Sequence, residues 1–381
     1  MMQGFAAERV QTERRGPDPL LLAALALLLG IGLSMLFTSS YVKASRYYGD
    51  PLHFLQRQLL PLSVGLAGAV VAAYISLERI QRWMPVIVVA TVAITILPFV
   101  PGIGQEYYGA GRWITVFGQS FQPSELVKLV LVLYLAYILS RKAETIDDPV
   151  NSLLPPVIIV AIFATLIYLQ NDFSTAFFVV TLGLVMFFIA NVPMQYFVGL
   201  GVMTVPLAIL LLLTREHRVR RILAFLDPER DPVGAGYQIL AAREALQYGA
   251  LWGVGVGRST KKLGGLPEAQ SDFVFAIVGE ELGFMGVLGV LALFVLFAVR
   301  GYQTAYRARD RFVSFAAFGL TSSILLQTFL NLAVVAGMVP ATGIPLPFFS
   351  AGGSSLLVTL LMAGLLVNCS RQVAAEEDGN G

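Results

Sequence analysis

One carboxylate, Asp272, stands at the edge of a long apolar segment and is the strongest candidate for chemistry in this sequence. It lies in Leu-Pro-Glu-Ala-Gln-Ser-Asp-Phe-Val-Phe-Ala-Ile-Val-Gly-Glu-Glu, residues 266–281, where the longest polar loop meets the next apolar run. An acid at the boundary of water and lipid is costly and usually has a function. The functional interpretation is a general base. The structural alternative is a helix N-cap that accepts hydrogen bonds from the first free amides.

A second pair of charged residues, Glu125 and Lys128, lies in Gln-Pro-Ser-Glu-Leu-Val-Lys. Their spacing of three places both on one face of a helix. Pro123 suits the first helical position, and the helix dipole then favours an anion at Glu125. Lys128 falls inside an apolar run, where an unpaired charge costs about 2.5 kcal/mol or more. We therefore predict that the two form an ion pair facing a wet cavity.

Basic side chains occupy the polar segments near these acids. Arg112 lies in Gly-Ala-Gly-Arg-Trp-Ile-Thr, and Arg221 ends an arginine-rich run at 215–221, with Lys262 further along the same loop. The planar guanidinium fork suits phosphate recognition. The alternatives are an interfacial arginine beside a tryptophan, and a solvated charged face.

Three further features are expected to support a site. Asp172 lies in a very short turn, where capping is its default role. Glu280 and Glu281 lie within an apolar segment, so at least one should face the interior and pair. Residues 340–355 contain three prolines and three glycines, which predicts a non-helical loop lining an aqueous cavity. Ser354 is expected to cap the helix that follows.

The elements that position these residues are apolar segments of membrane-spanning length. Of 381 residues, 56% are hydrophobic and 13% charged, whereas soluble proteins are nearer one quarter charged. Helices or closed barrels alone satisfy their backbone in lipid, and these segments do not alternate in polarity. We therefore predict an all-α polytopic membrane protein with ten transmembrane helices. They span 20–38, 56–76, 84–101, 123–140, 153–170, 174–191, 197–214, 273–299, 312–338 and 354–370.

The distribution of basic residues predicts the orientation. Ten spans place the tails, 1–19 and 371–381, on one side of the transmembrane domain, 20–370. Segments on that side hold 12 Lys and Arg, against 4 in the short opposite loops, so both termini are predicted to be cytoplasmic. The long extracellular loop 215–272, between helices 7 and 8, is basic as well, but long loops cross largely regardless of charge.

Two segments of this long loop have their own signatures. Residues 237–248 contain no Gly or Pro and mix apolar with charged side chains, which suits a helix lying at the membrane surface. Five glycines then predict a pliable segment: Gly253, Gly255, Gly257, Gly264 and Gly265.

Composition argues against several other functions. A net charge of +2 gives no indication of nucleic acid as a partner, and the single cysteine, Cys369, permits no internal disulfide. The two histidines lie far apart, and no dedicated metal site is visible. The candidate residues together predict an outward-facing cavity for an anionic substrate. Physical reasoning does not decide whether that substrate is moved or modified.

The motifs resemble the SEDS family (shape, elongation, division and sporulation proteins), and more closely its RodA branch. Three residues depart from the family pattern: Ser271 replaces a usual threonine, Asn171 a proline and Ala351 a tyrosine. The matching stretches are Gly-Arg-Trp-Ile at 111–114, Phe-Gln-Pro-Ser-Glu-Leu-Val-Lys at 121–128, Phe-Leu-Asp-Pro-Glu-Arg-Asp-Pro-Val-Gly-Ala-Gly-Tyr-Gln at 225–238, Leu-Pro-Glu-Ala-Gln-Ser-Asp-Phe at 266–273, Glu-Glu-Leu-Gly at 280–283, and the Pro-Leu-Pro-Phe loop through Gly-Gly-Ser-Ser.

This resemblance implies polymerisation of peptidoglycan glycan strands from lipid II at the outer face of the bacterial plasma membrane, with a class B penicillin-binding protein as partner. It implies that Asp272 is the essential loop aspartate and that Arg112, Glu125, Lys128 and Arg221 line the substrate cavity. Lys262 and Ser354 are further candidate substrate-binding residues.

The loop Thr-Gly-Ile-Pro-Leu-Pro and Gln170 near Asp172 resemble the elongation branch. Three alternatives stay open: the division-branch homologue, a transporter that flips a lipid-linked precursor, and a non-catalytic scaffold. No cofactor is certain, and a divalent cation could share the charge of a pyrophosphate leaving group.

Overall fold

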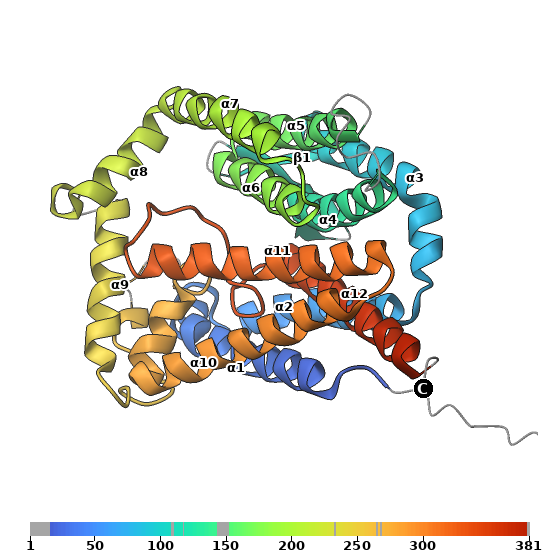
Figure 1. The fold of residues 1–381 in the computed structure, drawn as a ribbon. Helices are drawn as coiled ribbons and strands as arrows, with labels where there is room; N and C mark the ends of the chain where they lie inside the picture. Colours follow the sequence, from blue (N-terminus) through green and yellow to red (C-terminus); the bar gives the residue numbers. More distant parts are fainter. Residues whose placement is uncertain are drawn as a thin grey trace, which may run out of the picture.

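Ten apolar helices dominate the structure (Figure 1), as the sequence predicts. The computed structural model describes residues 16–107, 110–116, 118–142, 152–231, 234–263, 266 and 269–378, so most of the predicted N-terminal tail and the last three residues lie outside it. Eight helices are long and apolar enough to cross a membrane, and α5 and α6 are shorter. They are α1 (Pro19–Tyr48), α2 (His53–Tyr74), α3 (Leu77–Ile96), α4 (Pro123–Lys142), α5 (Leu154–Leu169), α6 (Phe173–Ile189), α7 (Met194–Leu213), α10 (Val274–Arg307), α11 (Arg311–Val335) and α12 (Gly353–Asp378).

The first helix begins and the last helix ends on the same side of the molecule. Asp18 caps α1, accepting from the N–H of Leu20 at 2.9 Å, and its carboxylate lies 2.6 Å from Nε of Arg300 in α10. The Asp18 N–H also points to Oγ of Ser370 in α12, at 3.5 Å. The start of α1 and the end of α12 therefore share a side, which agrees with an even number of crossings. Figure 1 shows α8 and α9 at the opposite end.

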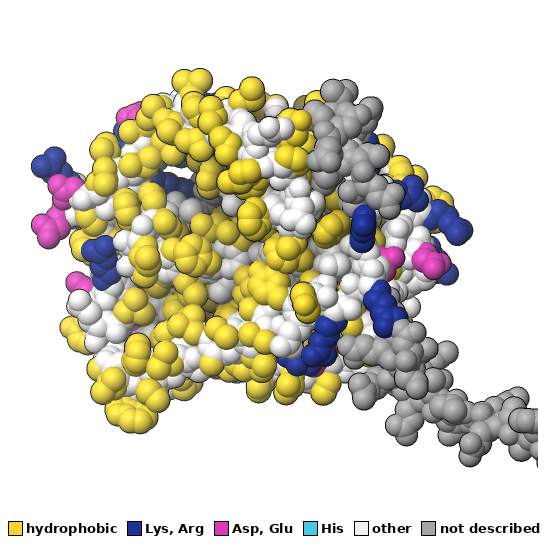
Figure 2. Space-filling model, in the orientation of Figure 1, with side chains coloured by type: hydrophobic (Ala, Val, Ile, Leu, Met, Phe, Trp, Pro, Cys, Tyr) yellow, Lys and Arg dark blue, Asp and Glu magenta, His cyan; other side chains and the backbone are white. Residues whose placement is uncertain are grey.

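The centre of the bundle is formed by α4, α11 and α12, which are mostly buried, whereas no residue of α7 is buried. In Figure 1, α11 runs between the α4–α6 group and the α1–α10 group, and it packs against α4, α6, α10 and α12. The face of the molecule seen in Figure 2 is largely apolar, with most charged side chains toward its left and right edges. A polar residue on α4 or α11 must therefore find its partner inside the protein.

The long loop folds into helices, one of which, at residues 237–248, was predicted from its composition. Residues 237–248 fall within α9 (Ala235–Gly249), which follows α8 (Glu216–Leu226). Helix α9 is more than a surface helix, because Ile239, Ala242 and Ala245 are buried and the helix packs against α10. The short 3-10 helices of this loop are η3 (Pro228–Arg230) and η4 (Lys261–Leu263).

The segment between α3 and α4 contains strands, which the sequence pattern did not indicate. After a 3-10 turn, η1 (Leu97–Phe99), it forms an antiparallel sheet in the order β1-β2-β3: β1 (Gly104–Tyr107), β2 (Ala110–Val116) and β3 (Gln119–Phe121). Strand β2 contains Trp-Ile-Thr-Val, and β-branched and aromatic residues favour strands. Ile114 of β2 is buried. The sheet holds Arg112 on a rigid element.

The predicted eighth span is broken rather than continuous, and α10 extends to Arg307. At Gly283 the backbone has φ +68° and ψ −171°, which separates residues 274–282 as a half-helix. A Cβ at Gly283 would lie 2.2 Å from the main-chain nitrogen of Gly253, so the close approach requires glycine. The loop before α10 satisfies the freed backbone groups: Val254 N–H donates to Glu280, Gly255 to Glu281, Phe284 to Ala250 and Met285 to Leu251.

The glycine string of the loop also adopts conformations that other residues avoid. Gly253, Gly255 and Gly257 have φ of 75°, 101° and 79°. The chain can thus turn tightly beside the break in α10. Gly264 and Gly265, the remaining members of the predicted pliable segment, lie outside the described residues.

Candidate active site

Asp272 lies in the turn that ends the long loop and is half-buried. Phe273, rather than Asp272, occupies the N-cap position of α10, and the Phe273 side chain makes no capping bond. The Asp272 carbonyl accepts a hydrogen bond of 3.0 Å from Nδ2 of Asn331 in α11. A Cβ on Gly343 would lie 3.8 Å from Oδ2 of Asp272. The carboxylate therefore lies beside the loop between α11 and α12.

That loop is non-helical, as its prolines and glycines predict, and it is bonded to the Asp272 turn. Ser350 Oγ donates to the carbonyl of Ser271 at 2.5 Å and accepts from the N–H of Leu346 at 2.8 Å. The N–H of Ala351 donates to the carbonyl of Gln270 at 2.8 Å. The two segments, far apart in sequence, therefore form one unit around the carboxylate.

The predicted ion pair between Glu125 and Lys128 is confirmed. Nζ of Lys128 lies 2.7 Å from Oε2 of Glu125, and the two side chains are 2% and 5% exposed. Nζ also donates to Oε1 of Gln327 in α11 at 2.8 Å and lies 5.4 Å from the ring centre of Phe178. Gln327 in turn donates from Nε2 to the carbonyl of Pro345, at 2.9 Å. The pair is thereby linked to the loop that borders Asp272. The wet cavity beside it stays a prediction.

Arg112 and Asp172 are brought together, a contact the sequence did not reveal. Nη1 of Arg112 lies 3.3 Å from Oδ2 of Asp172, and the arginine side chain is 36% exposed. Asp172 also caps α6, accepting from the N–H of Thr175 at 3.1 Å, so its predicted capping role is confirmed. Gln122 donates to the same carboxylate at 3.1 Å. Asp172 thus holds Nη1 of the guanidinium, and the arginine side chain remains partly exposed.

Ser354 does not have the capping role expected of it. Helix α12 begins at Gly353, and Oγ of Ser354 accepts from the N–H of Gln122 at 2.9 Å and donates to the carbonyl of Ser120 at 3.3 Å. Its hydroxyl ties the start of α12 to the connection between β3 and α4. A positioning role explains these contacts better than direct substrate binding.

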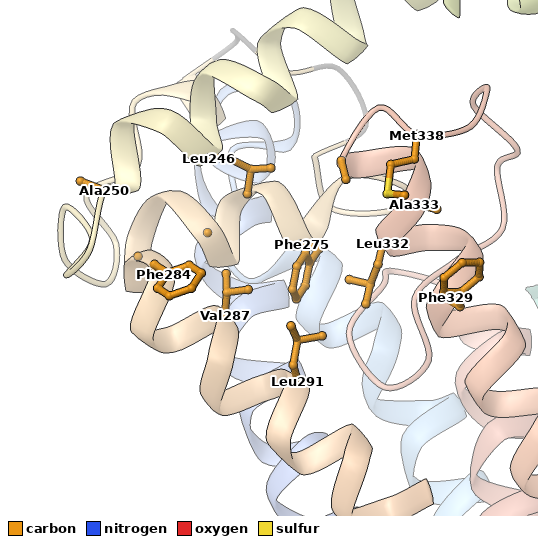
Figure 3. Close-up of a pocket in the computed structure, with 13 residues that line it drawn as sticks. Leu246, Ala250, Phe275, Phe284, Val287, Leu291, Phe329, Leu332, Ala333 and Met338 are labelled. Carbon is orange, nitrogen blue, oxygen red and sulfur yellow. The ribbon is translucent and has the colours of Figure 1, made fainter.

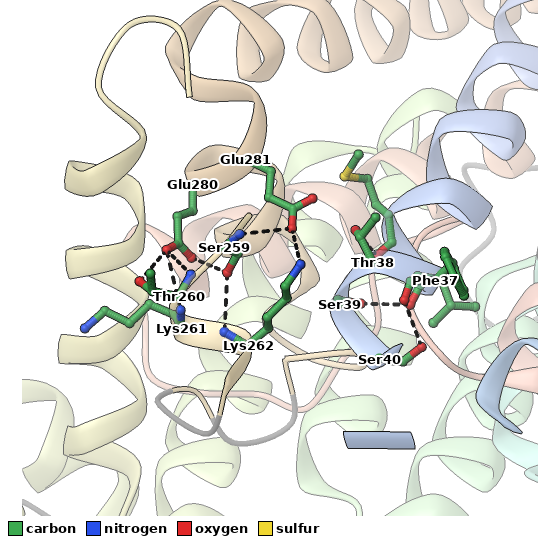
Figure 4. Close-up of polar contacts among 12 residues, drawn as sticks. Phe37, Thr38, Ser39, Ser40, Ser259, Thr260, Lys261, Lys262, Glu280 and Glu281 are labelled. Atoms are coloured by element: carbon green, nitrogen blue, oxygen red, sulfur yellow. Dashed lines mark hydrogen bonds and ion pairs between the residues drawn. The ribbon is translucent and has the colours of Figure 1, made fainter. Parts of the chain in front are cut away.

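Lys262 likewise has a buried partner inside the protein. Its Nζ lies 2.9 Å from Oε1 of Glu281, with the two side chains 6% and 0% exposed (Figure 4). Glu280 accepts from Thr260 through both its N–H (2.8 Å) and its hydroxyl (2.9 Å), and also from Ser259. The predicted pairing of Glu281 is confirmed. The ammonium of Lys262 anchors the loop on α10, and its predicted substrate-binding role stays a prediction.

The arginine-rich run has two different roles. Arg218 is buried, donates to the carbonyl of Leu211 at 2.8 Å and stacks 4.8 Å from the ring centre of Tyr168, so it is structural. Arg221 is exposed and reaches the carbonyl of Ala341 at 3.4 Å. It therefore approaches the same loop as Asp272. Figure 2 shows a hollow beneath α7 and beside α8, with basic side chains in its depth.

An apolar cavity of about 500 Å³ lies between α9, α10 and the end of α11 (Figure 3). Its walls include Leu246, Phe275, Phe284 and Leu332, and none of its lining residues is titratable. It offers no proton acceptor or charge and is not the place for the chemistry. Within the described part of the chain, no three His, Cys, Asp or Glu side chains gather as a metal site requires.

Two amides on α11 are the functional candidates that sequence reasoning missed. Gln327 and Asn331 lie one turn apart, are both buried, and contact the segments described above. The available signal was the pair of large polar side chains at a spacing of four within an apolar segment.

Comparison with known proteins identifies the family. Residues 19–375 match the sequence profile of the FtsW, RodA and SpoVE family, described as a cell cycle protein. The chain belongs to this family. The SEDS assignment made from the motifs is therefore confirmed, and with it the polytopic helical fold.

Curated relatives and solved structures match over nearly their whole length. The chain is 37% identical over 358 residues to a probable peptidoglycan glycosyltransferase FtsW of Geobacter sp. (strain M18), covering 94% of this chain and 98% of that protein. It is 38% identical to the stage V sporulation protein E of Bacillus subtilis (strain 168), covering 94% and 98%.

Among structures, a chain from a peptidoglycan synthase complex, described as coordinating polymerization and crosslinking, superposes with a TM-score of 0.75 at 28% identity, covering 94% and 98%. Rod shape determining protein RodA of Thermus thermophilus gives 0.67 at 26% identity, covering 93% and 97%. Relatives thus carry FtsW, sporulation and rod-shape names.

Proposed function

We propose that this protein is a peptidoglycan glycosyltransferase that polymerises lipid II, with Asp272 as general base. The observation that carries the proposal is the position of Asp272, half-buried and held at the junction of the long loop, α11 and the α11–α12 loop. A base of this kind must be fixed within hydrogen-bond reach of the proton it removes. Curated relatives named peptidoglycan glycosyltransferases support the same reaction.

In the proposed reaction, Asp272 accepts the proton of the GlcNAc 4-hydroxyl of an incoming lipid II. The hydroxyl oxygen attacks the anomeric carbon of the terminal MurNAc of the growing strand. A new glycosidic bond forms as the bond to undecaprenyl pyrophosphate breaks, so the configuration at the anomeric carbon inverts. The leaving group departs with the bonding electrons as an anion.

Positive charge must meet the pyrophosphate, and such preorganised electrostatics commonly give the largest catalytic effect. Arg112 and Arg221 suit this role, because each uses one edge of its guanidinium within the protein and remains at least partly exposed. Glu125 and Lys128 form the buried floor of the proposed site. Lys262 and Ser354 hold its loops in place. No step is assigned to a divalent cation.

We propose that the protein lies in the bacterial plasma membrane, with both termini cytoplasmic and Asp272 at the outer face. The excess of basic residues on the termini side supports this orientation. A class B penicillin-binding protein is the proposed partner, supported by the similarity to a chain of a peptidoglycan synthase complex.

Two cellular roles fit this activity. The loop Thr-Gly-Ile-Pro-Leu-Pro and Gln170 favour elongation, whereas relatives named FtsW favour division. Affinity purification of the tagged protein from its own host distinguishes them. Recovery of the elongation transpeptidase supports the first role, and recovery of the division transpeptidase supports the second.

The activity is tested with purified protein, labelled lipid II and detergent, with and without the penicillin-binding partner. Glycan polymer from the wild type and none from Asp272→Ala supports the proposal. Asp310→Ala is the matched control, because Asp310 is an aspartate that caps α11 at the opposite end of the bundle. It should leave polymerisation intact.

The same assay addresses the alternatives. Absence of polymer, together with lipid II exchange between liposome leaflets that survives Asp272→Ala, would instead establish a transporter. Complementation of a depleted strain by Asp272→Asn would favour a scaffold, because a scaffold does not need that carboxylate.

A further inference from the structure

The side chain of Asn331 makes an unusual pair of contacts at the centre of the molecule. It is fully buried on α11, and its Nδ2 donates to two main-chain carbonyls at 3.0 Å each. One carbonyl belongs to Asp272 and the other to Ile344 of the α11–α12 loop. The loop residue Gly343, next to Ile344, lies near the Asp272 carboxylate, because a Cβ there would be 3.8 Å from Oδ2.

The two hydrogens of a primary amide lie in a plane at a fixed angle. An Asn side chain that donates both to different carbonyls therefore fixes the separation and direction of two main-chain segments. At Asn331 those segments are the residue that carries the candidate base and the loop that forms the wall beside it. The anchor itself cannot easily move, because α11 is mostly buried and packs against α4, α10 and α12.

Gln327, one turn earlier on the same helix, makes the corresponding connection to the ion pair. Its Oε1 accepts from Lys128 at 2.8 Å, and its Nε2 donates to the carbonyl of Pro345 at 2.9 Å. Ile344 and Pro345 are consecutive, so the two amides hold adjacent carbonyls of one loop. The two amides thus connect Asp272 and the Glu125–Lys128 pair, through hydrogen bonds, to the same short segment.

We propose that Asn331 is a positioning residue for the glycosyl transfer, acting through the main chain of Asp272, with Gln327 fixing Lys128 against the same loop. This inference rests on the proposed function. A carboxylate displaced by about 1 Å from its productive position can lose about 10²-fold in rate, even when substrate binding is unchanged. Loss of Asn331 should therefore act mainly on kcat.

A purely structural role would also explain two buried hydrogen bonds, and the chain offers a matched control. Asn368 of α12 is buried, and its Nδ2 donates to the carbonyls of Ala72 and Ile75 at 2.7 and 2.6 Å. It lies on the termini side of the bundle, within a few residues of Ser370, which contacts Asp18. Replacement of either Asn by Leu removes two buried hydrogen bonds at similar volume, but only Asn331 touches the Asp272 turn.

The experiment compares wild type, Asn331→Leu and Asn368→Leu in full-length protein purified with its penicillin-binding partner. Thermal unfolding and steady-state polymerisation of labelled lipid II are measured for each, as separate kcat and KM values. Similar losses of thermal stability are expected for both variants. Only Asn331→Leu should lose kcat, by about 10- to 100-fold, with KM changed by less than about twofold.

Asn331→Ser is a second variant, used in case Asn331→Leu fails to fold. The serine hydroxyl is smaller and can donate one hydrogen bond rather than two. An intermediate kcat is expected for it. Equal kcat losses in the Asn331 and Asn368 variants, or a loss confined to KM, would overturn the inference. Absence of polymer from the wild type would instead overturn the proposed function, so the two failures are distinguishable.

Discussion

The buried ion pair between Glu125 and Lys128 gives the most quantitative prediction. Both side chains are almost fully buried and their charged atoms lie 2.7 Å apart. Lys128→Met leaves an uncompensated buried carboxylate, and Glu125→Gln leaves an uncompensated ammonium. Breaking a buried pair in this way costs about 3–5 kcal/mol. Lys128→Met also removes the donor to Gln327, and a buried acceptor left without a partner costs about 1–3 kcal/mol.

The double variant distinguishes an ion pair from two independent residues. Glu125→Gln with Lys128→Met leaves no buried charge at this position. Replacement of a buried pair by neutral groups of similar volume is often close to neutral. We therefore expect the double variant to be more stable than either single variant. The interaction free energy from the cycle should be at least about 3 kcal/mol, well above the error of such cycles.

The measurement is the free energy of unfolding of all four proteins in one detergent. Glu216 and Arg220 in α8 provide the control pair, because they lie 2.6 Å apart and are 79% and 74% exposed. The same cycle there should give about 0.5 kcal/mol or less. Additive effects of Glu125→Gln and Lys128→Met would refute the reasoning, because they would show that neither charge compensates the other.

Three further outcomes are expected. Gly283→Ala should lower the yield of monodisperse protein on size exclusion, because a Cβ there lies 2.2 Å from a main-chain nitrogen, whereas Gly289→Ala, with open space around it, should not. The pKa of His217 is held below its ordinary value by partial burial and by neighbouring arginines, so its NMR titration midpoint should fall below that of a free histidine. The stabilising contribution of neutral His217 is present above the pKa of histidine in the unfolded chain, and it is lost as pH falls through the lower pKa of the folded protein. His217→Gln should therefore flatten the acid side of the curve of unfolding free energy against pH. Lys262→Met should accelerate proteolysis of the loop that precedes α10, and adding Glu281→Gln should partly reverse this; an unchanged cleavage rate would contradict the anchoring role.

The features predicted correctly from the sequence depend on local physics. The ten apolar helices in the described part of the chain follow from the length of apolar chain that a bilayer requires. The Glu125–Lys128 pair follows from helical spacing and the cost of an unpaired charge in lipid. The cap at Asp172 follows from its place in a short turn. The pairing of Glu281 follows from the cost of an unpaired charge in lipid, although the identity of its partner, Lys262, does not.

The features missed depend on contacts between distant segments. The break at Gly283 exists because the main chain of Gly253 crosses it, and neither glycine signals this alone. The sheet that carries Arg112 depends on the pairing of strands of 4, 7 and 3 residues, whose sequences show no extended alternation. Ser354 was expected to cap its own helix, but its hydroxyl bonds Ser120 and Gln122, more than two hundred residues away.

Helix α11 explains why widely separated motifs act together. The stretches 121–128, 266–273 and 340–355 carry the resemblance to the family, yet none of them belongs to this helix. Gln327 and Asn331 contact one residue or more in each stretch: Lys128, Asp272, Ile344 and Pro345. A polar face only one turn long, in a mostly buried helix, thus fixes the acid, the ion pair and the loop to a common rigid support. A change on this face should therefore disturb all three motifs together.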